Sequence, residues 1–105
     1  MKPFDIFIIY LSWGDDGKNR PVLVFVLDDE VVDIYQITTK YEEKGEAVRE
    51  MYFKIVDWVQ AGLEKQSYID TGTLISLPIA ALKNKTPIGK LTENDKLRLL
   101  EFLNR

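Results

Sequence analysis

The sequence predicts a mainly β domain with some helix, in the form of a small, strongly bent barrel with a C-terminal helix. Three observations predict it: the chain has only 105 residues, short β-rich runs alternate with turns, and one segment near the C-terminus has helical periodicity. A chain of this length forms one domain, here residues 1–105. Short strands and one terminal helix fit a small barrel.

The predicted strands are runs rich in apolar and β-branched residues: Asp5–Leu11, Pro21–Leu27, Val31–Ile37, Met51–Val56 and Ser67–Leu77, with a short edge segment at Thr86–Leu91. The continuous apolar run Val22–Val26 predicts a strand that is buried on both faces. The acidic turn Asp28–Glu30 predicts a hairpin between the second and third strands. Gly72 interrupts the fifth run, which indicates a bulge or a sharp bend there.

The segments between these strands are predicted as loops and short helical turns. Ser12–Asn19 is dense in turn-forming residues and predicts an exposed loop. Lys40–Glu50 is charged and lacks apolar periodicity, so we expect a loop with at most one helical turn. Asp57–Gly62 predicts a short helical turn closed by its glycine, and Pro78–Leu82 begins another.

The final helix has the clearest local signal. Thr92 followed by Asp95 forms a variant capping box, and the acidic residues lie in the first turn, where they stabilise a helix. The predicted apolar face consists of Leu97, Leu100 and Leu103, together with Leu99 and Phe102.

Composition excludes several classes of chemistry. The chain has no cysteine, which excludes disulfides, thiolate zinc sites and thiol nucleophiles and fits a cytoplasmic protein. It has no histidine, which excludes a Ser-His-Asp triad and histidine metal sites. The carboxylates lack the spacing of a metal-binding loop, and no apolar run approaches the length of a membrane span. We therefore expect no metal, no cofactor and no membrane partner.

The net charge of −3 argues against a large basic nucleic-acid surface. It leaves room for local focusing, because several cations can gather on one side of the molecule. The candidates are Lys18, Arg20, Lys40, Lys44 and Lys54.

Arg20 lies where a polar, glycine-containing loop meets an apolar strand. Pro21 follows it and fixes the backbone torsion at the start of the strand. A permanent cation on a rigid element suits a group that binds an anion. The alternative is a loop arginine that pairs with a nearby carboxylate.

The segment Lys18–Val24, with its Arg-Pro-Val-Leu-Val run, resembles the signature of the MazF/PemK (Kid) toxins of type II toxin–antitoxin systems. Four further features appear in the order of that family. They are Asp5–Phe7, where Phe4 replaces the family's glycine, Ile37–Thr39, the turn Gly62–Ser67 with the strand start Ile69–Thr71, and Ile88–Thr92 before the last helix. Together they cover nearly the whole chain.

The resemblance implies an SH3-like barrel of the CcdB/PemK type and a toxin that acts as an mRNA interferase. Such a toxin is a metal-independent, sequence-selective endoribonuclease, and it leaves 2′,3′-cyclic phosphate and 5′-hydroxyl ends on single-stranded RNA. The implied partners are mRNA, a cognate antitoxin whose acidic segment covers the site, and a second copy of the chain in a homodimer.

The resemblance also implies catalytic positions. The family's arginine on the second strand and threonine after the third correspond to Arg20 and Thr38. The PemK/Kid branch uses an aspartate as the base, which corresponds to Asp70. That branch has an arginine two positions earlier, where this chain has Tyr68, and a histidine in the first loop, which this chain lacks.

Such a reaction needs a base, a cation and phosphate-holding donors. The candidates for RNA contacts are Lys18, Thr39, Ser67, Thr71 and Trp13. Each of these residues and the catalytic candidates also has a structural interpretation. Thr38, Thr39 and Ser67 can cap turns, Asp70 can accept a backbone hydrogen bond in a turn, and Trp13 can pack over a barrel end.

A second class of function stays open, a non-catalytic interaction module on the same barrel. It would be a degenerate family member, or a toxin similar to CcdB, which binds DNA gyrase. The acidic charge, the missing histidine and Tyr68 favour this alternative, whereas Arg20 together with Thr38 favours the enzyme.

Overall fold

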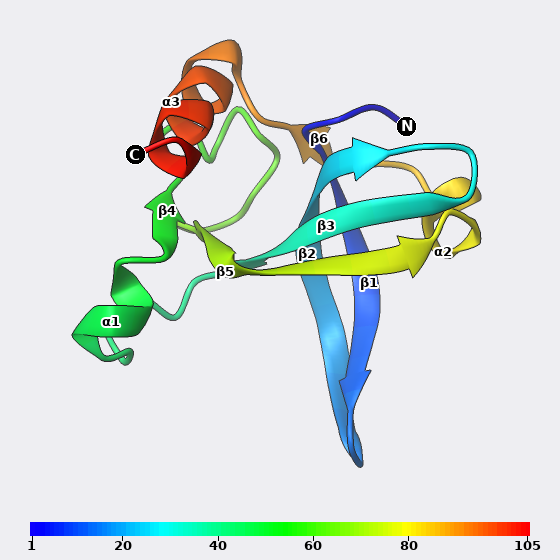
Figure 1. The fold of residues 1–105 in the computed structure, drawn as a ribbon, viewed down its shortest axis with the longest axis horizontal. Helices are drawn as coiled ribbons and strands as arrows, with labels where there is room; N and C mark the ends of the chain where they lie inside the picture. Colours follow the sequence, from blue (N-terminus) through cyan, green and yellow to red (C-terminus); the bar gives the residue numbers. More distant parts are fainter.

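The structure is a computed structural model that describes the backbone of residues 1–105 and every side chain except that of Trp13. Its strands are β1 (Asp5–Trp13), β2 (Asp16–Leu27), β3 (Val31–Thr38), β4 (Tyr52–Lys54), β5 (Tyr68–Pro78) and β6 (Gly89–Lys90), and its helices are α1 (Glu46–Arg49), α2 (Ala80–Lys83) and α3 (Glu93–Leu103). The strands form one antiparallel sheet in the order β4-β5-β3-β2-β1-β6, which curls into a half-barrel (Figure 1). The predicted fold class, mainly β with a C-terminal helix, is confirmed.

Two irregularities in strand pairing accompany the curl. A register shift between Val24 and Val26 marks a bulge in β2 against β3. A second shift, between Ile34 and Gln36 of β3, leaves extra residues in β5 around Gly72. Bulges bend the strand that carries them and increase its twist. The bend that the sequence predicts at Gly72 is therefore present.

The sheet carries a hydrophobic cluster on each face, because successive side chains of a strand point to opposite sides. One buried cluster includes Ile6, Leu23, Tyr35, Ile37, Phe53, Ile55, Ile69, Leu91 and Leu99, and the other consists of Phe7, Ile9, Val22, Val24, Val32, Ile34 and Leu82. Residues 22–24 are fully buried, as expected for a strand covered on both faces. Val26 lies beyond the bulge and is exposed, so the prediction fails at that end.

The prediction that Ser12–Asn19 forms a loop is wrong. Strands β1 and β2 stay paired as far as Trp13 and Asp16, so only two residues form the turn. Gly14 has a φ of 57°, a conformation that glycine adopts at little cost. The turn-forming residues therefore mark a tight turn at the end of a long hairpin, which leaves the rest of the sheet and ends at the bottom of Figure 1.

The apolar face predicted for α3 is only partly correct. Leu99 is fully buried, and Phe102 and Leu103 are partly buried, whereas Leu97 and Leu100 are 58% and 41% exposed. Residues 95, 99, 102 and 103 follow the helical period along one side, and this side packs on the sheet. Of the helices that the structure describes, none is both long and apolar enough to cross a membrane.

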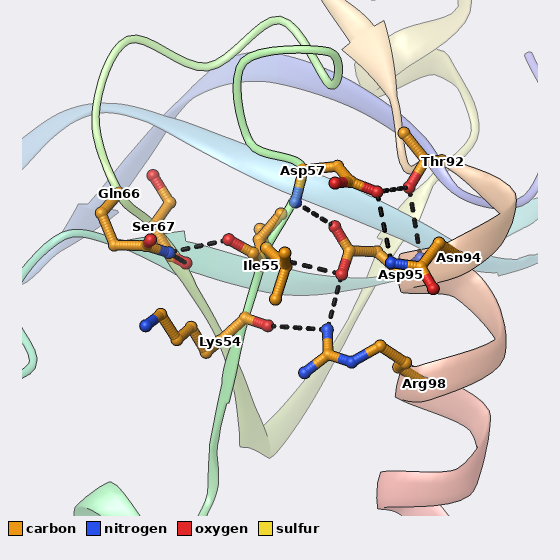
Figure 2. A network of polar contacts seen from close by, with 10 residues as sticks. Lys54, Ile55, Asp57, Gln66, Ser67, Thr92, Asn94, Asp95 and Arg98 are labelled. Atoms are coloured by element: carbon orange, nitrogen blue, oxygen red, sulfur yellow. Dashed lines mark hydrogen bonds and ion pairs between the residues drawn. The ribbon is translucent and has the colours of Figure 1, made fainter.

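A polar network fixes the segment around β4 against α3 (Figure 2). The buried carboxylate of Asp95 accepts the backbone N–H groups of Val56 at 3.1 Å and Asp57 at 2.7 Å. Arg98 donates to Asp95 at 2.6 Å and to the carbonyl oxygen of Lys54 at 3.4 Å. β4 follows α1 directly and is held from its other end by this network.

Candidate functional site

One row of side chains crosses four neighbouring strands on the same face of the sheet. Val22 of β2 is paired with Gln36 of β3, Gln36 with Asp70 of β5, and Asp70 with Tyr52 of β4. Residues directly opposite each other in antiparallel strands point to the same side. This face continues from the buried Val22 to the partly exposed Gln36, Asp70 and Tyr52, so the row leads from a core cluster to a polar surface.

Arg20 and Thr38 extend this polar surface. Each lies two residues beyond the Val22–Gln36 pair, Arg20 toward the start of β2 and Thr38 at the end of β3, and each is therefore on the same face. Both are partly buried. The hairpin of β2 and β3 thus brings the arginine and the threonine that the sequence analysis singled out to one place.

These residues surround a hollow of about 190 Å³, which we name the cationic hollow. Its lining consists of Arg20, Gln36, Thr38, Lys40, Lys44, Tyr52 and Asp70. Three of these side chains are cations and one is a carboxylate. The three predicted catalytic residues, Arg20, Thr38 and Asp70, therefore lie around the same space.

A second hollow of about 180 Å³ adjoins the first and shares three of its residues. Its lining consists of Lys18, Asn19, Arg20, Pro21, Ile37, Thr38, Thr39, Lys40 and Ser67. Three of the predicted RNA-contacting residues, Lys18, Thr39 and Ser67, are in this set. A groove with a high density of positive charge therefore extends beyond the cationic hollow.

The cations of this region repel one another. The pKa of Lys18 is lowered from its usual value, first by the positive charge of Arg20 and then by that of Lys40. A bound anion would relieve this repulsion, and Arg20 is the side chain best suited to hold it, because a guanidinium presents a planar fork of donors to phosphate oxygens. The arrangement favours a polyanionic ligand despite the acidic charge of the whole chain.

Thr38 and Asp70 make the local bonds expected of structural residues and also line the hollow. Thr38 Oγ1 accepts the N–H of Lys40 at 3.1 Å, which leaves the hydroxyl proton for donation to another group. Asp70 Oδ1 accepts the N–H of Gly72 at 2.9 Å, the turn bond that the structural interpretation predicts. A carboxylate accepts several hydrogen bonds, so this bond orients Asp70 without using its whole capacity.

The remaining predicted contacts are placed differently. Ser67 is buried and lines the second hollow, but its hydroxyl donates to the carbonyl oxygen of Lys65 at 2.9 Å and is therefore used within a turn. Thr71 donates to the carbonyl oxygen of Met51 at 2.6 Å and does not line either hollow. The prediction for Trp13 concerns a side chain outside those that the structure describes.

Sequence reasoning missed Gln36 and Tyr52. Tyr52 is opposite Asp70, and the pKa of its phenol is raised by partial burial and by the negative charge of Asp70, with a smaller opposite effect of Arg20. Tyr52 also lies beside Tyr41, with ring centroids 6.3 Å apart, and Tyr41 stacks on Tyr68 at 4.4 Å. Only the register of β4 against β5 identifies these neighbours, and the sequence has no local signal for it.

A third hollow, of about 290 Å³, adjoins the second and is more apolar. Its lining consists of Ile8, Pro21, Thr39, Gly62, Leu63, Glu64, Lys65, Ser67 and Ile88. Ile8 and Ile88 are 45% and 39% exposed. The groove therefore changes from positively charged to apolar along its length.

Among the side chains that the structure describes, no three carboxylates come together in a way that could hold a metal ion. A scan against protein-family models finds no match for this chain, and a search of curated protein sequences finds no significant match.

Proposed function

We propose that this chain is a metal-independent endoribonuclease that cleaves single-stranded RNA and leaves 2′,3′-cyclic phosphate and 5′-hydroxyl ends. The observation that carries the proposal is the convergence of Arg20, Thr38 and Asp70, from three different strands, on the cationic hollow. These are the positions that the resemblance to the MazF/PemK toxins implies. Phe4 adds support, since it occupies the position of the family's glycine and has a φ of 73°, a conformation that favours glycine.

The residues of the hollow can perform each step. Asp70 removes the proton of a ribose 2′-hydroxyl, the O2′–P bond forms, and the P–O5′ bond breaks. Arg20 holds the non-bridging phosphate oxygens, on which negative charge increases in the transition state, and the hydroxyl of Thr38 donates to the same group. Lys18, Lys40 and Lys44 attract the strand and bind neighbouring phosphates.

The biological setting that we propose rests on the same resemblance to the MazF/PemK toxins. As a toxin of a type II toxin–antitoxin system, the chain would form a homodimer and be held inactive by a cognate antitoxin. The groove suits a segment with both acidic and apolar side chains, because it joins the cationic hollow to an apolar one that contains Ile8 and Ile88. Such a segment would cover Arg20 and block access of RNA.

The second candidate is a non-catalytic interaction module. The third hollow favours it, since it is the largest of the three and its exposed isoleucines suit a protein partner better than RNA. Tyr68 in place of an arginine, and the absence of histidine from the chain, favour it as well. The two candidates differ in one observable, the cleavage of RNA.

The deciding experiment incubates purified protein with a long single-stranded RNA in the presence of EDTA. Wild type is compared with Arg20→Ala, with Arg20→Lys, which keeps the charge but loses the fork, and with Lys83→Ala, an exposed cation on α2. We expect defined cuts with cyclic phosphate ends from wild type and Lys83→Ala, and their loss in both Arg20 variants. Intact RNA at high concentrations of wild-type protein would overturn the proposal and favour the interaction module.

A further inference from the structure

Tyr52 is placed to take part in the reaction that we propose for the cationic hollow. It is paired with Asp70 across β4 and β5, so the two side chains lie next to each other on the same face. Both line the hollow together with Arg20 and Thr38. The residues that line the hollow include two with a hydroxyl group: Tyr52, whose hydroxyl is phenolic, and Thr38, whose hydroxyl is aliphatic.

The order of the strands places the two candidates for proton transfer next to each other and the two candidates for phosphate binding next to each other. Across the sheet, Tyr52 on β4 is followed by Asp70 on β5, Thr38 on β3 and Arg20 on β2. Neighbouring strands are about 4.8 Å apart, so Asp70 and Tyr52 can contact different oxygens of a phosphodiester whose non-bridging oxygens face Arg20 and Thr38. In-line displacement places the attacking 2′-oxygen and the leaving 5′-oxygen at opposite ends of the phosphorus, so the phosphodiester would lie with O2′ toward Asp70 and O5′ toward Tyr52. A tyrosine side chain is longer than an aspartate side chain, so the phenol can reach an oxygen that the carboxylate beside it cannot.

The electrostatics keep the phenol protonated. Partial burial and the negative charge of Asp70 both raise the pKa of Tyr52, and Arg20 offsets this only in part. A phenol that holds its proton at neutral pH can still give it to a departing alkoxide, because an alkoxide is a much stronger base than a phenolate. A phenol with a raised pKa therefore holds its proton before bond cleavage and can donate it during cleavage.

We infer that Tyr52 is the general acid of the proposed ribonuclease and protonates the leaving 5′-oxygen. This inference rests on the proposed function. Asp70 takes the proton of the 2′-hydroxyl as the O2′–P bond forms, and Tyr52 gives its proton to O5′ as the P–O5′ bond breaks. The carboxylic acid of Asp70 then returns a proton to the phenolate of Tyr52, its neighbour in the sheet, and both groups regain their starting states.

The neighbouring tyrosines provide matched controls. Tyr41 and Tyr68 stack on each other beside Tyr52, and neither lines the cationic hollow. If Tyr52 acted only by packing, replacement of its hydroxyl would resemble the same replacement in Tyr41 or Tyr68. If it acts as an acid, only Tyr52→Phe affects the departure of the leaving group.

The experiment compares two RNA oligonucleotides that differ at one atom. The first has the ordinary 5′-oxygen at the cleaved bond, and the second has sulfur in its place. A thiolate leaves without protonation, so the second substrate needs no general acid. The cleaved bond is first mapped with wild type, and rates are then measured for wild type, Tyr52→Phe, Tyr41→Phe and Tyr68→Phe with both substrates.

We expect Tyr52→Phe to cleave the oxygen substrate about 10²–10⁴-fold more slowly than wild type, the usual contribution of a general acid. With the sulfur substrate its rate should return to within a few-fold of wild type, and the two control variants should behave like wild type with both substrates. An equal loss of rate with both substrates, or no loss with either, would overturn the role of Tyr52 as the general acid. The proposal that the chain is a ribonuclease would still stand. If wild type cleaves neither substrate, the proposed function itself fails, and the role of Tyr52 fails with it.

Discussion

The carboxylate of Asp95 accepts the backbone N–H of Asp57 at 2.7 Å, and the carboxylate of Asp57 accepts the hydroxyl of Thr92 at 2.7 Å (Figure 2). The two aspartates thus join the N-terminus of α3 to the segment after β4 by two reciprocal bonds: a carboxylate on α3 accepts from that segment, and a carboxylate of that segment accepts from the residue that caps α3. Thr92 Oγ1 also accepts the N–H of Asp95, so one half of the predicted capping box is present. The other half differs, because Asp95 bonds to residues distant in sequence rather than back to Thr92.

The first prediction concerns this connection. Asp95→Ala removes the acceptor of two backbone N–H groups, at Val56 and Asp57, and of the guanidinium of Arg98. Asp95 is fully buried, so we expect a loss of about 3 kcal/mol in the free energy of unfolding, measured with urea. The control is Glu93→Ala, which removes an exposed ion pair with Lys96 and should cost less than about 1 kcal/mol. Equal losses in the two variants would contradict the structural role of Asp95.

The sequence predicts the β-rich runs and the last helix well because their signals are local. Apolar and β-branched residues mark strands, and the Thr92 cap marks the start of α3. The prediction fails for the β1–β2 hairpin, because residues 16–19 at the start of β2 are polar or glycine and mostly exposed, and leave no alternation of apolar and polar residues to detect. It also fails at Leu97 and Leu100, since only the packing of α3 on the sheet decides which leucines are buried.

For the candidate site, the limit is the range of the contacts. Arg20 and Thr38 meet because a short turn joins their strands, and the sequence is sufficient to place them together. Asp70 meets Gln36 through the register of β5 with β3, which is shifted by the extra residues around Gly72, and it meets Tyr52 through the register of β5 with β4. Pairing between distant strands is set by the whole core and not by any local pattern.

The second prediction concerns binding of the RNA backbone. Lys44 is exposed and lines the cationic hollow, whereas the exposed Lys54 lies on β4 outside the lining of the three hollows. Affinity falls as salt increases, so the slope of the logarithm of affinity against the logarithm of salt concentration is negative; if Lys44 binds a phosphate, Lys44→Gln makes this slope less negative by about 0.7. Lys54→Gln leaves the slope unchanged. The measurement uses a 2′-O-methyl oligonucleotide, which lacks the attacking hydroxyl, so binding is measured without cleavage. Equal slopes for wild type and Lys44→Gln would exclude this contact.

The third prediction concerns the titration of Tyr52. Asp70→Asn removes a negative charge and should lower the pKa of Tyr52, whereas Arg20→Gln removes a positive charge and should raise it. The shifts are measured by NMR of the labelled ring carbon that bears the hydroxyl. Unchanged values in both variants would contradict the arrangement of the hollow.

The same pKa sets a pH dependence of stability. Because the raised pKa of Tyr52 means that the folded chain binds the phenolic proton more tightly than the unfolded chain, this contribution to stability is complete below pH about 10, the ordinary phenol value. It is lost as pH rises through the pKa of the folded state. Tyr52→Phe should therefore show a smaller decrease in unfolding free energy over this range than wild type, whereas an equal decrease would contradict the linkage.

The fourth prediction concerns the backbone at Phe4, whose φ of 73° is unfavourable for any residue with a Cβ atom. Phe4→Ala and Phe4→Gly both lose the edge contact of the ring with Phe25, at 6.1 Å between centroids, so their difference isolates the backbone. The left-handed conformation costs alanine about 1–2 kcal/mol, and the extra freedom of glycine in the unfolded chain costs about 0.5–1 kcal/mol.

We therefore expect Phe4→Gly to be the more stable of the two variants, by about 0.5–1 kcal/mol in denaturant unfolding. The control is Tyr10, an exposed aromatic residue of β1 where φ is negative. There the order should reverse, because glycine within a strand is less stable than alanine. A more stable alanine variant at both positions would show that residue 4 carries no backbone strain in solution.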